Sequence, residues 1–202
     1  MAQKDWEPNA DPQSPEWDGV PGVEATKDLF GMPISLPPTE IRSRWTRKNL
    51  YLLFICPYDE LNLKPNPVTS EETNNLWNWD VAEAFIGADY LNTSRYKEFQ
   101  VSPQGEYVDL DIDRDDPKTQ KGVEWQSGFS AYGRVDSKKK VWYGEMKIPF
   151  AAFEKTPKAG DELRIGLYRI LGAAPNRIYL AWRPTGASTF HVPSAFGSLV
   201  LK

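Results

Sequence analysis

The chain has 202 residues, enough for one domain with a substantial hydrophobic core. Its net charge is −4, its longest basic run is three lysines and no apolar run reaches transmembrane length, so we expect neither a nucleic-acid nor a membrane partner. The single cysteine excludes an intrachain disulfide and a metal site built from several cysteines.

The first 39 residues are rich in proline and aspartate, which favours turns and irregular structure. We expect residues 1–39 to form an irregular arm packed on the domain, with Trp6 and Trp17 as surface anchors and a short edge strand near residues 30–36. We interpret the start near Ala2 as that of a mature, secreted or periplasmic chain whose signal peptide has been removed, although a cytoplasmic protein can begin in the same way.

Strand patterns begin at residue 40. Residues 40–48 alternate and the apolar run 49–56 follows a tight turn, which predicts a hairpin. A long polar loop of residues 57–79 comes next, and loops of that length are usually functional or disordered. Residues 80–88 are apolar at nearly every position except Glu83, which predicts a strand covered on both faces.

The next two predicted strands, residues 96–102 and 107–113, alternate between apolar and polar side chains. In the second of them we expect the aliphatic residues to face inward and the aspartates to face outward, the six residues being Val108, Leu110, Ile112, Asp109, Asp111 and Asp113.

The rest of the chain predicts five more strands and a single helical turn near residues 149–155. Residues 126–135 and 138–150 form a hairpin in this scheme, with Trp142, Met146 and Ile148 on one face. About ten strands with almost no helix predict an all-β fold, an antiparallel, jelly-roll-like β-sandwich over residues 40–202.

Two stretches of the chain resemble the family 9 carbohydrate-binding modules and their family 9-like relatives. They are residues 77–85 (WNWDVAEAF) and 182–199 (WRPTGASTFHVPSAFGSL), and their order and spacing carry the resemblance. It implies a non-catalytic protein that sandwiches a terminal sugar of a plant-type polysaccharide or oligosaccharide between two aromatic rings. Because family modules carry calcium and occur in larger secreted enzymes, a structural calcium and such a parent enzyme are further expectations.

The resemblance also implies which residues bind the sugar. Trp77 matches the first aromatic clamp, and Phe190 stands at the second, where the family has Trp. Phe190 lies in a loop rich in Gly, Ser and Thr, which favours an exposed or ligand-facing ring. The other predicted contacts are Glu83 at the buried acidic position, Gln100 and Ser102 on the next strand, and Trp79 and Arg183 beside the aromatic residues.

Several of these residues have a structural interpretation as well. The Trp77 ring can pack on the sheet and thereby fix its loop, and the Glu83 carboxylate can accept hydrogen bonds from loop N–H groups. The single histidine, His191, fits a structural role. The five aspartates between residues 109 and 116 would suit calcium, but a solvated acidic face explains them too, and the spacing of an EF-hand is absent.

Two other functions compete with sugar binding. A glycosidase or lyase would use Glu83 with a second carboxylate, and Glu98 lies on the neighbouring strand, although alternation does not force both onto one face. A haem protein would need axial ligands from Met32, Met146 and His191. The sequence contains no nucleophile elbow, phosphate loop or zinc ligand set.

Overall fold

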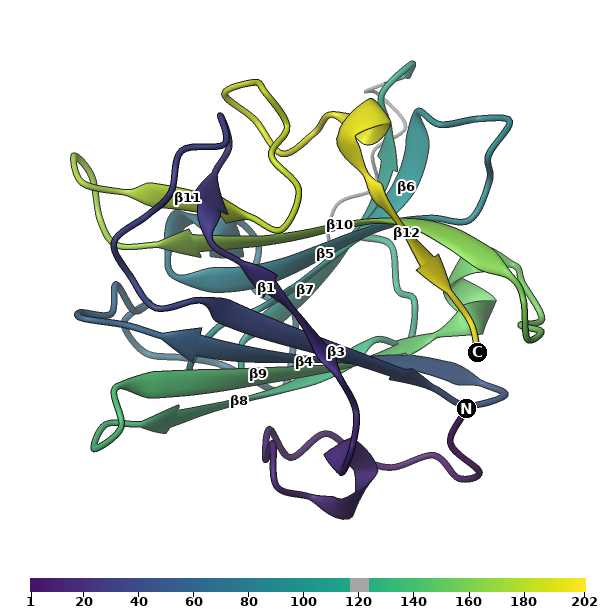
Figure 1. Ribbon diagram of the computed structural model, residues 1–202, viewed down its shortest axis with the longest axis horizontal. Helices are drawn as coiled ribbons and strands as arrows, with labels where there is room; N and C mark the ends of the chain where they lie inside the picture. Colours follow the sequence, from purple (N-terminus) through teal and green to yellow (C-terminus); the bar gives the residue numbers. More distant parts are fainter. Residues whose placement is uncertain (117–123) are drawn as a thin grey trace.

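Two antiparallel β-sheets packed face to face make up the computed structural model, which describes residues 1–116 and 124–202 (Figure 1). The smaller sheet contains, in spatial order, β1 (Gly22–Ala25), β3 (Thr39–Trp45), β4 (Asn49–Pro57), β9 (Val141–Pro149) and β8 (Ser130–Asp136). The larger sheet contains β2 (Lys27–Asp28), β11 (Ile178–Ala181), β10 (Glu162–Leu171), β5 (Val81–Gly87), β6 (Arg95–Val101) and β7 (Tyr107–Asp113), with β12 (Gly197–Val200) on β10.

The predicted all-β antiparallel sandwich is confirmed, with twelve strands in the described part of the chain. Its helical elements there are short 3₁₀ turns, η1 (Pro15–Trp17), η2 (Leu76–Asn78), η5 (Phe150–Phe153) and η6 (Pro193–Ala195). The η5 turn lies where the sequence predicts a helical turn, whereas the other three turns were not predicted. Neither described segment contains a helix suited to crossing a membrane.

The main core lies between the two sheets. The predicted shared face of Trp142, Met146 and Ile148 on β9 is fully buried there, against Phe99 and Val101 of β6. The sheets approach closely at Gly144, where a Cβ atom would lie 2.8 Å from a methyl carbon of Val101. This apolar layer fixes the larger sheet in place.

The outer face of the larger sheet is apolar and largely covered as well. A second cluster of buried side chains includes Phe85 of β5, Tyr96 of β6 and Tyr168 of β10. Val108, Leu110 and Ile112 of β7 belong to this cluster, so the prediction that they face the inter-sheet core is wrong. Their aspartate neighbours lie on the opposite face of β7, where Asp109 is opposite Phe99 and only 1% exposed.

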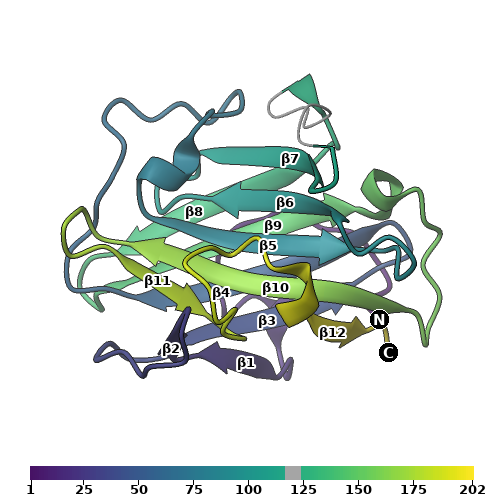
Figure 2. The same cartoon turned by 90° about the horizontal axis from the view of Figure 1, so that it is seen from above.

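One loop crosses over this outer face. Because β5 occupies one edge of β10, β11 and β12 share the other edge, with β11 on residues 168–171 and β12 on residues 162–165. The chain between them, residues 182–196, leaves the sheet and passes over β10 before it returns (Figure 2). We call this segment the crossing loop, and it brings Phe190 and His191 onto the sheet.

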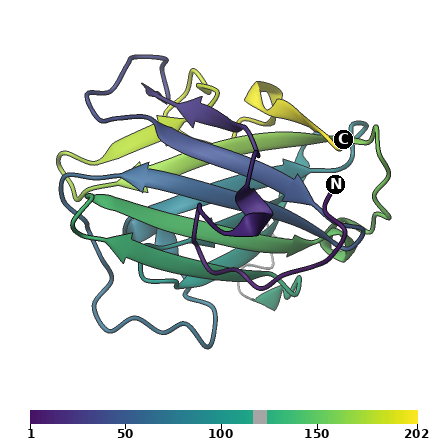
Figure 3. The same cartoon turned by 60° about the horizontal axis from the view of Figure 1, so that its bottom comes forward.

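The N-terminal segment covers the outer face of the smaller sheet (Figure 3). Trp6 stacks on Tyr51 with ring centroids 3.5 Å apart, and Trp17 is buried against the same sheet. Both indole N–H groups donate to Glu145 Oε1, over 2.7 and 3.2 Å, and the backbone N–H groups of Asn9 and Ala10 donate to its Oε2. Trp6 and Trp17 thus anchor the arm as buried or half-buried rings.

The expected irregular arm of residues 1–39 also contains two short strands. β1 pairs with β3 in the smaller sheet, and β2 pairs with β11 in the larger one. The edge strand expected near residues 30–36 is reduced to a single bridge between Lys27 and Pro33. A domain boundary at residue 39, where β3 begins, stays a prediction.

Candidate functional site

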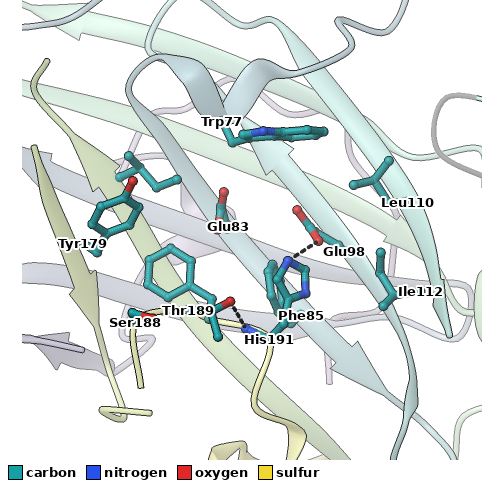
Figure 4. Close-up of a pocket in the computed structure, with 12 residues that line it drawn as sticks. Trp77, Glu83, Phe85, Glu98, Leu110, Ile112, Tyr179, Ser188, Thr189 and His191 are labelled. Atoms are coloured by element: carbon teal, nitrogen blue, oxygen red, sulfur yellow. Dashed lines mark hydrogen bonds and ion pairs between the residues drawn. The ribbon is translucent and has the colours of Figure 1, made fainter. Parts of the chain in front are cut away.

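A pocket of about 300 Å³ opens on the outer face of the larger sheet. Its floor comes from β5, β6, β7 and β10, and its walls come from the η2 turn, β11 and the crossing loop (Figure 4). The residues that line it are Trp77, Glu83, Phe85, Glu98, Leu110, Ile112, Ile170, Tyr179, Ser188, Thr189, Phe190 and His191.

Trp77 is carried by the η2 turn at the pocket rim. Leu76 beside it is fully buried, which ties the turn to the sheet. The guanidinium group of Arg177 donates hydrogen bonds to the backbone carbonyls of Trp77, Asn78 and Trp79. One planar side chain therefore fixes three successive carbonyl groups, and with them the position of the Trp77 ring.

Phe190 forms part of the pocket wall as a buried ring, only 6% exposed. It stacks on Tyr168 with centroids 4.3 Å apart and meets Phe85 and Tyr179 edge to face. Of the two expected positions, exposed or ligand-facing, the ring is not exposed but lines the pocket, and its contact with a sugar stays a prediction. Its burial follows from the crossing loop, which lies over the apolar outer face.

Two carboxyl groups lie on the pocket floor. In the pairing of β5 with β6, Glu83 is opposite Gln100 and Phe85 is opposite Glu98, so Glu83 and Glu98 share one face of the sheet. Their exposed fractions are only 2% and 3%. Figure 4 shows both carboxyl groups pointing toward the ring of Trp77.

Burial governs the protonation of this pair. It raises the pKa of Glu83 well above its ordinary value, the nearby Glu98 carboxyl adds to the rise, and Arg177 opposes it. Burial also raises the pKa of Glu98 to about 7, although a hydrogen bond from Gln100 opposes that shift. Near neutral pH the pair therefore holds protons that an exposed carboxylate would have lost.

His191 lies beside the pair in a neutral form. Its Nδ1 is 2.5 Å from the Tyr96 hydroxyl, and its Nε2 is 4.0 Å from Glu98 Oε2. Burial, together with the positive charge of Arg114, lowers the pKa of His191 to about 4. The contact with Glu98 is therefore no ion pair at neutral pH, and Glu98 Oε2 has no hydrogen-bond partner among the described residues.

The structure brings together three of the predicted site residues, Trp77, Glu83 and Phe190. Four others do not line the pocket: Gln100, Ser102, Trp79 and Arg183. Gln100 is fully buried and donates to Glu98 Oε1 over 2.6 Å, while Ser102 Oγ accepts N–H groups from the turn after β6. Trp79 is half-buried at the end of the η2 turn, and Arg183 is exposed.

Sequence reasoning missed several residues of the pocket. Glu98 was considered only as a partner for a catalytic pair, although strand alternation places it on the same face as Gln100. His191 was taken as structural, and Tyr179 was not singled out. The sequence marks His191 and Tyr179 only by their position within or beside the 182–199 motif. The folding of the crossing loop and β11 brings these two side chains to the pocket.

The aspartates of β7 do not suit a calcium ion. Asp111 contacts the Lys97 ammonium at 2.5 Å, Asp113 contacts the Arg95 guanidinium at 2.8 Å, and Asp109 accepts hydrogen bonds from Ser127. The described residues contain no cluster of three or more His, Cys, Asp or Glu side chains that could hold a metal. A structural calcium stays a prediction that these side chains do not support.

The three residues considered for haem ligation lie apart. Met146 is buried between the two sheets, and Met32 is 63% exposed. His191 lies on the outer face of the larger sheet, in the pocket. These side chains therefore do not form a common ligand set.

Comparison with known proteins gives one family and two relatives. The family model described as carbohydrate family 9 binding domain-like matches residues 14–202. An "Extracellular protein" of Arthroderma benhamiae is 26% identical over 176 residues, which cover 81% of this chain and 78% of that protein. The UPF0462 protein C4orf33 homolog of Rattus norvegicus is 27% identical over 166 residues, covering 80% and 74% of the two chains.

Solved structures share the fold at low sequence identity. A protein of Bacteroides uniformis proposed to bind carbohydrate superposes with a TM-score of 0.79 at 16% identity, covering 100% of this chain and 95% of that one. A family 9 module of Caldicellulosiruptor kristjanssonii in complex with glucose gives 0.65 at 13% identity, with 100% and 94% covered. The cellotriose complex of a family 9 module from the same organism gives 0.63 at 13% identity, covering 99% and 91%.

Proposed function

Because the chain belongs to the carbohydrate family 9 binding domain-like family, we propose that it is a non-catalytic protein that holds a terminal sugar of an oligosaccharide or polysaccharide in the pocket beneath Trp77. The structures of family 9 modules with glucose and cellotriose support this ligand class. The relative named an extracellular protein supports a secreted location, and attachment to a larger enzyme is part of the proposal.

The observation that carries the proposal is an indole ring over a floor with two carboxyl groups. A pyranose has apolar C–H faces that pack on aromatic rings and hydroxyl groups that need polar partners. Trp77 offers such a ring, and Glu83 and Glu98 offer hydrogen-bonding groups beneath it. At about 300 Å³ the pocket is at the lower end of the usual range, which suits the end of a glycan better than a long internal segment.

Calorimetric titration with glucose, cellobiose and xylobiose tests the proposal. We expect binding by the wild type and none by Trp77→Ala, because the variant loses the ring that covers the sugar. Tyr132→Ala is the matched control, since this half-exposed aromatic residue lies on β8 of the other sheet. Equal binding by wild type and Trp77→Ala, with circular dichroism unchanged, would contradict the site.

One observation supports a second candidate function, a sugar-active enzyme of the glycosidase or lyase type. Glu98 lies on the same face as Glu83, and their raised pKa values leave at least one carboxyl group protonated near neutral pH, as a general acid requires. Release of reducing ends from xylan or cello-oligosaccharides by the wild type, and its loss in Glu98→Gln, would favour this candidate. Binding without turnover would exclude it for those substrates.

A further inference from the structure

The pocket contains two acidic side chains and neither lysine nor arginine among its lining residues. We propose that it takes a sugar with a free amino group, a hexosamine, whose ammonium group lies between the carboxylates of Glu83 and Glu98. The inference rests on the proposed function, because it concerns the ligand class of the same pocket.

The first reason is the lack of partners on the two carboxyl groups. Glu98 Oε2 has no hydrogen-bond partner among the described residues, and no hydrogen bond is among the causes that shift the pKa of Glu83. Both side chains are more than nine-tenths buried and line the cavity. Buried polar atoms are normally hydrogen-bonded, so their missing donors are expected from a ligand. An ammonium group supplies three N–H donors and a positive charge in one small group.

The second reason is that no lysine or arginine side chain lines the cavity, although Arg177 and Arg114 act on its titratable groups from outside it. Arg177 donates to the carbonyl groups of the η2 turn and Arg114 is exposed, and neither lines the pocket. Lys97 and Arg95 lie on the other face of β6, where they contact Asp111 and Asp113. When the two glutamates ionise, the cavity therefore carries negative charge that none of its lining residues balances.

The third reason is the aromatic surround. Trp77, Phe85, Tyr179 and Phe190 all line the cavity, and the faces of such rings attract cations through their quadrupoles. The same rings pack on the C–H face of a sugar, so a hexosamine uses both properties of the wall. A uronic acid would instead bring a third carboxyl group into the cavity, and like charges repel.

Ammonium binding must also change the protonation of the pocket. The titratable and charged groups around the carboxyl pair are His191, Tyr96, Tyr168, Arg177 and Arg114. His191 is neutral near pH 7, and burial raises the pKa of both tyrosines, so Glu98, with a pKa of about 7, is the group that titrates there, while the pKa of Glu83 is raised in the same direction. A bound cation favours their ionised forms, so binding releases protons to the buffer.

The test compares matched sugars by calorimetry at about pH 6.5, where the amino group of a hexosamine is protonated and Glu98 is partly so. The probes are glucosamine, glucose, N-acetylglucosamine and glucuronate, with galactosamine and galactose as a second pair. We expect an amino sugar to bind at least about tenfold more tightly than its neutral analogue, a difference of about 1.4 kcal/mol. Glucuronate is expected to give no binding.

Two further measurements distinguish recognition of the ammonium charge from recognition of the shape of the sugar. Titrations in buffers with different ionisation enthalpies should detect proton release with the amino sugar and not with glucose. Glu83→Gln and Glu98→Gln keep the size of the side chain and remove its charge, so each should bring the amino sugar down to the affinity of its neutral analogue.

The outcomes distinguish this inference from the proposed function. Neutral sugars that bind as tightly as amino sugars, or more tightly, would overturn the inference and leave sugar binding intact. If wild type and Glu83→Gln showed the same preference for the amino sugar over its neutral analogue, the role of the Glu83 carboxylate would be overturned. Failure of every sugar to bind would overturn both the inference and the proposed function.

Discussion

At the scale of single residues, the side chains that face the pocket are held by others that do not. Arg177 fixes the turn that carries Trp77, Gln100 holds one oxygen of Glu98, and Tyr96 contacts His191. Gln100 was predicted to touch the sugar, but it is fully buried and does not line the pocket; it lies opposite Glu83 and donates a hydrogen bond to Glu98. The pocket is therefore set up by the protein before a ligand arrives, which lowers the entropy lost on binding.

Arg177→Lys tests this support. A lysine ammonium lacks the planar fork that reaches three carbonyl groups, so the Trp77 turn should loosen and sugar affinity should fall by roughly tenfold. Lysine keeps the positive charge, so Arg177→Met is the companion variant: it should in addition raise the pKa of Glu83 and move the pH profile of binding upward.

The control for both variants is Arg47→Lys, an exposed arginine in the β3–β4 hairpin. It should leave affinity and pH profile unchanged. Wild-type affinity in Arg177→Lys would mean that the buried Leu76 holds the turn without help from Arg177.

At the scale of strands and turns, the sequence predicts where strands lie better than which way they face. β5, β6 and β7 lie within a few residues of their predicted positions because their apolar and alternating runs are clear. The faces of β7 were reversed because alternation alone cannot identify the inner face of a sheet that is covered on both sides. Asp109 is buried, and its Oδ2 accepts hydrogen bonds from Ser127.

The attachment of the arm gives a prediction at the same scale. Glu145→Gln replaces one carboxylate oxygen by an NH₂ group that faces N–H donors of the arm, so buried donors lose their acceptor. We expect a loss of roughly 2–4 kcal/mol in the free energy of unfolding, since each unsatisfied buried group costs about 1–3 kcal/mol. Limited proteolysis should cut the arm faster, while sugar binding should persist.

Glu7→Gln is the comparison for that experiment. Its carboxylate is 81% exposed and pairs with Lys147, and such exposed pairs contribute little to stability. If Glu145→Gln instead abolished sugar binding with the fold intact, the arm would have to support the pocket through the sandwich.

At the scale of the whole molecule, the buried carboxyl groups make stability depend on pH. Because the folded protein raises the pKa of Glu98 from 4.5 to about 7, it binds more protons than the unfolded chain between those values. Stability from this group therefore falls as pH rises through that window, and the raised pKa of Glu83 acts in the same direction. His191, whose pKa is lowered to about 4, acts oppositely between about pH 4 and 6.5.

Thermal unfolding between about pH 5 and 8 checks this balance. Glu98→Gln keeps an acceptor for Gln100 but cannot ionise, so its Tm should exceed that of wild type more at pH 8 than at pH 5. Glu60→Gln, at an exposed glutamate, should follow the wild-type curve. A constant offset between Glu98→Gln and wild type would contradict the assigned protonation.

The sandwich as a whole was predictable, and its pocket was predictable only in part. Strand runs and scarce helix signals predict two packed sheets, and the 77–85 motif predicts Trp77 and Glu83 as neighbours in the site. The burial of Phe190 and the position of His191 depend on how β11 and β12 share one edge of β10. That arrangement is a long-range pairing without a local sequence signal, so single-strand patterns do not reveal it.

The first part of the arm, which contains Trp6 and Trp17, covers the outer face of the smaller sheet (Figure 3), whereas the pocket opens on the outer face of the larger sheet. Two copies cross-linked through their arms would therefore point their binding sites in opposite directions. The two sites of such a pair cannot bind the same glycan end, so the pair gains no avidity for a single end. It would instead bridge two separate chains, which makes the arm a suitable attachment point for building a glycan cross-linker.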